Sequence, residues 1–377
     1  MHRAGARGKS RARQWVDDLP GDGIEARLST MGGARLAKTS ILAAAILVWA
    51  LWLLGMQAGA RWPLLAEAWF MSITMAVGSF IAGATAEGGG AVAFPVMTLM
   101  FAIPPPVARD FALMIQSVGM TSASATILYT RIPIEPRALW WSGLGGVFGV
   151  VAGIEWISPR LPPAYTKMTF LAVWLAFAGA LFLINRHRDR EVRPAIERFR
   201  PRHGLMLVAT GLVGGAISGL TGSGLDILTF ALLTLRFRVC ETIATPTSVV
   251  LMASNALVGF AWKATFGGGM EQAAWAYWWA CVPIVVVGAP LGARFIRDRS
   301  RLFVASILYV SIAIQFVAGI LIIPQTTRLA GYTVLVLVAA LLGFHWMARG
   351  GMKRLVWLSS SPPEHPARPH RPRDAVA

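Results

Sequence analysis

Long apolar runs without charge constrain this chain more than any other feature. Residues 39–60 hold no charged side chain, and about 20 apolar residues in a helix are enough to cross a bilayer. Similar runs follow at about 108–130, 138–159, 164–185, 240–263, 273–296, 302–323 and 331–348. Only 14% of the residues are charged, which is too few to cover the surface of a soluble protein. The sequence therefore predicts an all-α, polytopic helical membrane protein.

A hydrophobic segment broken by glycine occurs twice, 136 residues apart. The first copy contains Gly88-Gly89-Gly90 and the second contains Gly222-Ser223-Gly224. Aligned without a gap, residues 77–108 and 213–244 are identical at Val77, Gly78, Ile81, Gly83, Thr85, Gly88, Phe94, Thr98, Leu99, Phe101 and Ala108. Such self-similarity indicates a structural unit used twice. In a membrane chain, paired segments interrupted by glycine indicate a transporter whose binding site lies at the break.

The net charge of +17 raises the question of nucleic-acid binding. The basic residues gather in the two tails, in 186–202 and in 294–301. They do not form a stripe interleaved with aromatic residues, so we expect no nucleic-acid partner. The positive-inside rule for a protein in a lipid bilayer explains the same distribution.

If each broken segment is a helical hairpin, nearly all basic residues fall on one side of the membrane. Of the 35 Lys and Arg residues, the exceptions are Arg61, Arg109, Arg160, Lys167, Lys263 and Arg328. Counting each broken segment as one straight span scatters the charges over both sides instead. We therefore expect a multi-pass protein of the cell inner membrane with both termini in the cytoplasm.

This topology gives two inverted repeats, each a Gly-broken helical hairpin plus three spans. Repeat 1, residues 68–185, begins outside, and repeat 2, residues 204–323, begins inside. Inverted repeats with interrupted helices are a recurring plan of secondary transporters.

Other segments flank or join these repeats. They are a cytoplasmic basic N-terminal tail (1–38, of which 1–30 is expected to be disordered), an extra span (39–60), a cytoplasmic linker (186–203), a second extra span (331–348) and a disordered basic C-terminal tail (349–377). The sequence leaves open whether translation starts at Met1 or Met31, and whether the chain forms a homo-oligomer.

Residues for catalysis or metal binding are scarce. The six histidines lie in the tails, the linker and the last span, and there are only two cysteines, Cys240 and Cys281. No phosphate-binding loop of the Walker type is present. We therefore expect no catalytic residues, no metal site and no cofactor. This weighs against the main alternative from another class, a membrane-embedded enzyme acting on lipids.

The two breaks are the candidate binding site. Helices that restart after Gly88-Gly89-Gly90 and after Gly222-Ser223-Gly224 would point N–H groups, including that of Leu225, at a buried space. The N-terminus of a helix favours an anion, so the expected partner is a small anionic substrate. Thr247 and Ser248 of the following span could add hydroxyls. The structural alternative is that the glycines and hydroxyls only pack helices together.

Two carboxylates, Glu87 and Asp226, stand at the breaks. An ionisable residue inside a membrane is costly, so both are candidates for proton coupling. Asp226 has a structural alternative, because Ser223-x-x-Asp226 fits a capping box at the start of a helix. Both interpretations of Asp226 remain open from the sequence, as does a cation-coupled importer that uses the two carboxylates to bind its ion.

The glycine segments also carry a family resemblance. The first copy has Gly83, Gly88-Gly89-Gly90, Pro95 and Ala108, and the second has Gly214, Gly219, Gly222, Gly224, Ala244 and Thr247-Ser248. In this pattern the chain resembles the TauE/SafE family of sulfite and organosulfonate exporters, over about 68–323. The resemblance implies export of a small anion, such as sulfite, an organosulfonate or a related organic anion, across the inner membrane.

Overall fold

The structure, a computed structural model, describes residues 45–85, 88–185, 192–296 and 301–359. Within these ranges it is helical and contains no β-strand. Seven helices in this part are long and apolar enough to cross a membrane, namely Pro105–Tyr129, Pro136–Arg160, Pro163–Leu183, Pro201–Thr221, Glu241–Thr265, Gln272–Phe295 and Thr327–Arg349. The prediction of a polytopic helical membrane protein is confirmed.

The elements recur along the chain. Repeat 1 holds α4 (Trp69–Ala84), α5 (Gly88–Pro95), the π-helix η1 (Val96–Met100), α6 (Pro105–Tyr129), α7 (Pro136–Ala152) with its continuations η2 (Gly153–Ile157) and η3 (Ser158–Arg160), and α8 (Pro163–Asn185). Repeat 2 holds α9 (Pro201–Thr221), α10 (Leu225–Ala231), the π-helix η4 (Leu232–Arg236), α11 (Glu241–Thr265), α12 (Gln272–Ile296) and α13 (Arg301–Ile322). A proline begins each of α6, α7, α8 and α9, a position where its missing N–H costs nothing.

The recurrence extends to backbone hydrogen bonds. The bounds of η1 and α6 precede those of η4 and α11 by the same 136 residues that separate the sequence copies. The Ile103 N–H donates to the Met97 carbonyl at 2.9 Å, and the equivalent Val239 N–H donates to the Leu233 carbonyl at 2.9 Å. The internal repeat is therefore a repeat of structure as well as of sequence.

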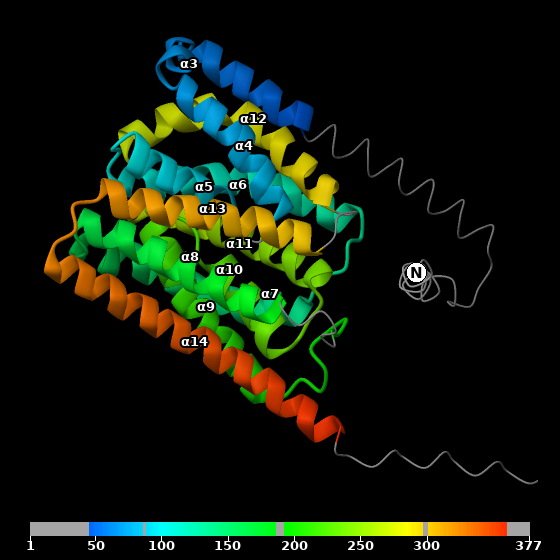
Figure 1. Ribbon diagram of the computed structural model, residues 1–377. Coiled ribbons are helices and arrows are strands. Elements are labelled where there is room, and N and C mark those ends of the chain that lie inside the picture. The colour runs from blue at the N-terminus through cyan, green and yellow to red at the C-terminus, as the bar shows by residue number, and fades with distance from the viewer. Residues whose placement is uncertain (1–44, 86–87, 186–191, 297–300, 360–377) are drawn as a thin grey trace, which may run out of the picture.

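The two repeats exchange their packing partners. Helix α4 of repeat 1 packs on α12 of repeat 2, and α9 of repeat 2 packs on α7 of repeat 1. The equivalent helices α6 and α11 pack on each other, and α8 and α13 lie side by side and antiparallel (Figure 1). This exchange is what a two-fold relation between the repeats would produce. The inverted orientation of the repeats in a membrane remains a prediction.

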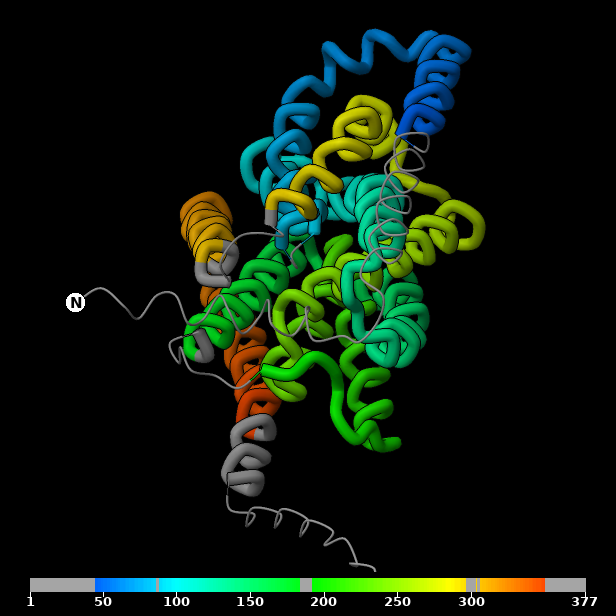
Figure 2. The backbone as a smooth tube through the Cα atoms, turned by 90° about the vertical axis from the view of Figure 1, so that its right-hand side faces the viewer, coloured from blue at the N-terminus to red at the C-terminus, as the bar shows by residue number. Residues whose placement is uncertain are grey.

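Two further elements lie at opposite edges of the bundle (Figures 1 and 2). The helix Ala45–Ala58, followed by the short α3 (Pro63–Glu67), lies against α12, where Trp52 donates to the Trp279 carbonyl at 2.7 Å. The helix α14 (Thr327–Ser359) lies against α8 and η4. Helix α14 continues to Ser359, beyond the predicted end of the span at residue 348, because Lys, Arg, Leu and Met in this stretch favour helix. The bounds of the membrane span within α14 remain a prediction. Residues 1–38 and 360–377 lie outside the described residues.

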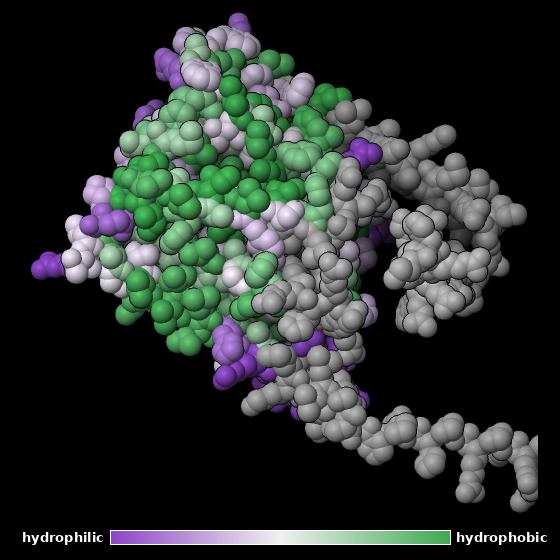
Figure 3. All heavy atoms as spheres, viewed as in Figure 1, coloured by the Kyte–Doolittle hydropathy of each residue, from purple (hydrophilic) through white to green (hydrophobic). Residues whose placement is uncertain are grey.

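Apolar side chains dominate the outer face of the bundle. Figure 3 shows them as a broad area over the helices, with hydrophilic residues toward its edges. Large side chains such as Leu205, Trp140 and Leu321 are more than two-thirds exposed. Water would disfavour so much exposed apolar surface, whereas lipid would cover it.

The linker contacts two of the turns that join the helices. The Arg193 N–H donates to the Arg238 carbonyl at 2.8 Å, and the Ile196 N–H donates to Glu135 Oε2 at 2.9 Å. Arg137 in turn donates to the Ile196 carbonyl. Thus three basic segments that were predicted to share one side of the membrane do lie together.

Candidate functional site

The first break separates α4 from α5. Helix α4 ends at Ala84 and α5 begins at Gly88, which has a φ of +73° that side chains with a Cβ rarely adopt. Glu87 lies outside the described residues. Gly88, Gly89 and Gly90 are all buried, and N–H groups in the first turn of a helix have no acceptor within the helix. The break therefore directs backbone donors into the interior of the protein.

The second break satisfies its own backbone groups. Gly222 ends α9 in a left-handed conformation, with a φ of +86°. The Gly224 N–H donates to Asp226 Oδ1 at 2.8 Å, and the Leu225 N–H donates to Ser218 Oγ at 3.0 Å. The Ser223 hydroxyl donates to Asp226 Oδ2 at 3.1 Å. Asp226 thus holds the backbone at the start of α10, although the N-cap there is Gly224 and not the Ser223 of the expected capping box. Proton coupling by Asp226 remains a prediction.

Gln116 of α6 joins the two breaks. Its side chain is 1% exposed, and its Nε2 donates to the Gly222 carbonyl at 2.8 Å and to the Ala112 carbonyl at 2.9 Å. The same amide lies directly against Gly90, where a Cβ would overlap Nε2. A Cβ at Gly88 would lie 3.2 Å from Oε1. Sequence analysis assigned Gln116 no role, although an amide in the middle of an apolar span is a signal that could have identified it.

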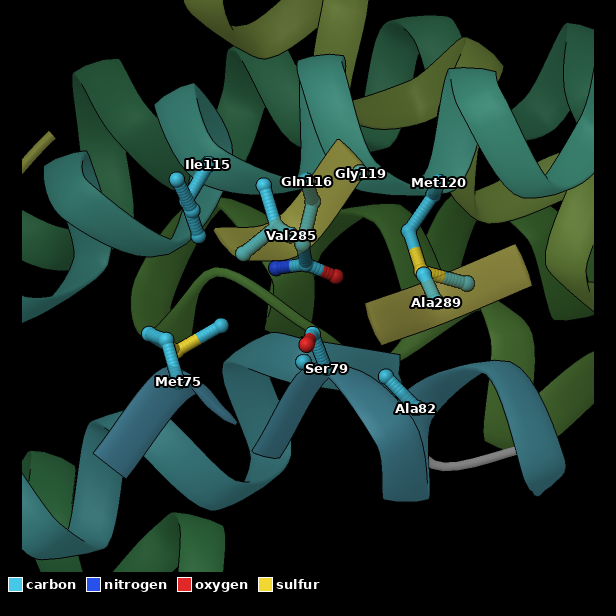
Figure 4. A pocket seen from close by; sticks show the side chains of 10 residues that line it. Met75, Ser79, Ala82, Ile115, Gln116, Gly119, Met120, Val285 and Ala289 are labelled. Atoms are coloured by element: carbon cyan, nitrogen blue, oxygen red, sulfur yellow. The ribbon is translucent and has the colours of Figure 1, made fainter. Parts of the chain in front are cut away.

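A small cavity lies beside the first break, between α4, α5, α6 and α12. It is lined by Met75, Ser79, Ala82, Gly89, Ile115, Gln116, Gly119, Met120, Val285 and Ala289. Figure 4 shows Ser79 and Gln116 pointing into it from opposite sides. It has room for about one water-sized group.

Two polar atoms at this cavity lack a partner. Among the described residues, neither Ser79 Oγ nor Gln116 Oε1 makes a hydrogen bond, and both are buried. Buried polar atoms in native proteins are nearly always hydrogen-bonded, so each exception calls for an explanation. A bound ligand would provide one.

Thr247 and Ser248 have partners of their own. The Thr247 hydroxyl donates to the Ile243 carbonyl at 2.6 Å and accepts from the Glu135 N–H at 2.9 Å. The Ser248 hydroxyl donates to the Thr245 carbonyl at 2.8 Å. Hence the structure gathers Gly88, Gly90 and Gly222 around Gln116, whereas these two hydroxyls support α11 and the loop before α7.

A buried ion cluster lies at the start of α6. Arg109 donates to Asp110 Oδ1 at 2.7 Å, Lys263 Nζ lies 3.2 Å from Asp110 Oδ2, and the Glu271 N–H donates to that same oxygen at 2.9 Å. A Cβ at Gly222 would lie 3.1 Å from the Arg109 carbonyl oxygen. The cluster therefore ties the start of α6, next to the second break, to the end of α11 and the loop that follows it.

Comparison with known families bears directly on these breaks. The family model described as Sulfite exporter TauE/SafE matches residues 70–317, from α4 into α13, and so includes both breaks and Gln116. No curated protein and no solved structure matches the chain. The matched segment is well over half of the 377 residues. The chain therefore belongs to the TauE/SafE sulfite exporter family, a family of membrane transporters.

Proposed function

We propose that this protein is a secondary transporter of the bacterial inner membrane that exports a small anion. The substrate class would be sulfite, an organosulfonate or a related organic anion. The observation that carries the proposal is the pair of glycine breaks buried in the core and joined through Gln116, which donates to the Gly222 carbonyl and lies against Gly90. Interrupted helices that meet inside the membrane are where secondary transporters bind their substrates.

The charge of the substrate follows from the groups at the breaks. The start of α5 presents backbone N–H groups and the positive end of a helix dipole, which attract an anion. The one described carboxylate at the breaks, Asp226, already accepts hydrogen bonds from Ser223 and Gly224. These contacts favour an anion site over the cation-coupled importer. Outward movement of a monoanion is also favoured by an inside-negative potential, by about 2.3 kcal/mol per 100 mV.

We do not propose an enzymatic function. A lipid-modifying enzyme would need a nucleophile or an acid and base in contact at a site open to the interface. The acids of the described core instead serve structural contacts, as Asp226 does at α10 and Asp110 does at α6.

Flux measurements on the purified protein in liposomes test the proposal. Liposomes would be loaded with labelled sulfite, sulfoacetate, sulfate or acetate, and efflux would be followed with and without an imposed potential. We expect at least one of the sulfur oxyanions to leave faster than from protein-free liposomes, and faster still when the potential drives negative charge outward. Failure of all four anions to move would refute the proposal.

A further inference from the structure

Arginine side chains gather at one end of the helix pair α7 and α9. Arg137 lies in the first turn of α7, and Arg202 lies in the first turn of α9. Arg198 and Arg200 lie in the linker, just before α9. All four side chains are exposed, and we call them the arginine patch. The two helices pack on each other, and the predicted topology places this end of the pair at the cytoplasmic surface.

Ring contacts hold the linker against the start of both helices. The Arg137 guanidinium lies over the Phe199 ring, 5.4 Å from its centroid, and donates to the Ile196 carbonyl at 2.7 Å. The Phe199 and Trp141 rings have centroids 6.2 Å apart. A Cβ at Gly204 of α9 would lie 3.1 Å from the Trp141 ring. The arginine patch is therefore one surface, built from α7, α9 and the linker.

The acids near the patch have other partners. Glu197 pairs with Arg193 at 2.6 Å. Glu135 is buried, and its carboxylate accepts from the Ile196 and Arg137 backbone N–H groups. Within the ranges that the structure describes, no salt bridge reaches a side chain of the patch. The patch therefore keeps a positive charge that attracts an anionic partner.

Exposed apolar side chains continue from the patch along both helices. Residues three or four apart in a helix share a face, and one such row begins at Arg137 on α7 and another at Arg202 on α9. The rows consist of exposed residues, namely Trp140, Leu144 and Phe148 on α7 and Leu205, Ala209, Leu212 and Val213 on α9. Tryptophan beside a basic residue at the end of an apolar span is typical of the membrane interface. The two rows thus extend from the interface into the region of the acyl chains.

We infer that the arginine patch binds the headgroup of an anionic phospholipid, whose acyl chains lie along the exposed rows of α7 and α9. Basic clusters beside membrane spans attract anionic headgroups, and a guanidinium group can bind two phosphate oxygens at once. A free phosphate would meet the same arginines but would leave the apolar rows below them unused. The rows therefore favour a lipid over a soluble anion.

The bound lipid would also contact both repeats. Helix α7 belongs to repeat 1, α9 belongs to repeat 2, and the linker joins the two. A headgroup on the patch would hold the linker against both helices. The inference concerns the protein in its membrane and does not depend on which substrate is transported.

Lipid binding to the purified protein in detergent tests the inference. Native mass spectrometry would compare phosphatidylglycerol with phosphatidylcholine of the same acyl chains, since the headgroup of the second lipid has no net charge. We expect phosphatidylglycerol to bind about tenfold more tightly or better. An excess of soluble glycerol phosphate should not displace it, because glycerol phosphate has no acyl chains to place on the rows.

Substitutions of exposed arginines test the location. The double variant Arg198→Asn with Arg202→Gln removes two charges of the patch, and asparagine tolerates the φ of +44° at position 198. We expect affinity for phosphatidylglycerol to fall about 10- to 30-fold, because each arginine near a headgroup contributes about fivefold. Affinity for phosphatidylcholine and the melting temperature should not change. The control is Arg349→Gln on α14, which packs on α8 and η4, and it should leave binding within about twofold of wild type.

A photoactivatable phosphatidylglycerol would locate the lipid in the unmodified protein. Its acyl chain should crosslink to peptides that contain residues 140–148 and 205–213. Equal binding of the two lipids, displacement by glycerol phosphate, crosslinks only to other helices, or unchanged binding in a folded double variant would overturn the inference. So would an equal loss in Arg349→Gln. If the double variant failed to fold, the crosslinks would still decide. None of these measurements uses anion flux, so their failure would leave the proposed function standing.

Discussion

Single residues distinguish the two breaks, whose backbones are alike. Asp226 and Ser218 close the second break with their own side-chain oxygens, whereas Gly90 and Ala82 supply none at the first. Gln116 contacts both breaks by its amide, through Gly222 and Gly90. The repeat preserves the backbone, while the side chains at the two breaks differ.

The Asp226→Asn variant tests the role of the acid at the second break. Asparagine keeps an oxygen that can accept the Gly224 N–H but cannot release a proton. Because the carboxylate already serves as a cap, we expect near-normal sulfite efflux with an unchanged pH profile, measured in liposomes. A flattened pH dependence would establish Asp226 as a proton relay instead.

Comparison of Gly88→Ala with Gly268→Ala separates the cost of backbone strain from the cost of a packing clash. Both have a positive φ, +73° and +77°, but a Cβ at Gly88 would overlap the side chain of Met252, whereas nothing lies within 4 Å of one at Gly268. We expect Gly268→Ala to cost about 1 kcal/mol from backbone strain alone. Gly88→Ala should cost more, because Met252 must also move. Thermal unfolding in detergent measures the loss of stability in each variant. Equal losses would mean that the Met252 side chain moves aside without cost.

At the scale of helices, the sequence predicts spans better than it predicts contacts. Long apolar runs predict the helices, because a single segment inside a bilayer can form all of its backbone hydrogen bonds only as a helix. The positions of the breaks could be predicted from glycine, because the glycines of the two copies align without a gap. An amide in an apolar span marks Gln116 as a candidate, but its partners could not be predicted, since they are carbonyls brought near by folding. The hydroxyls of Thr247 and Ser248 looked available in sequence but have partners in the structure.

The buried ion cluster should stabilise the start of α6. Asp110 is fully buried and is the only acid in it, facing Arg109 and Lys263. Asp110→Asn would leave two buried cations without a counter-charge, so we expect a loss of about 3–5 kcal/mol. Lys263→Met should cost less, because the Arg109–Asp110 pair survives. Comparison of the melting temperatures in detergent checks this order, and a milder effect of the Asp110 change than of the Lys263 change would contradict it.

For the whole molecule, the exchange of packing partners makes the two repeats interdependent. Because α4 packs on α12 and α9 packs on α7, neither repeat can bury its own first helix. The breaks then meet in the interior where α6 and α11 cross between the repeats.

The predicted topology places the linker in the cytoplasm and the loop between α11 and α12 outside. The linker lies against the turns at Glu135 and Arg238, so the basic segments that contain them must share one side. Cysteines introduced at the exposed positions Ala195 and Gln272, in a Cys240→Ser background whose remaining Cys281 is buried, test this in intact cells. We expect a membrane-impermeant maleimide to label Gln272→Cys from outside and Ala195→Cys only after the cells are opened. External labelling of Ala195→Cys would reject the hairpin at the first break and, with it, the inverted repeat, because with a cytoplasmic N-terminus the linker can be cytoplasmic only if that break turns the chain back within the membrane.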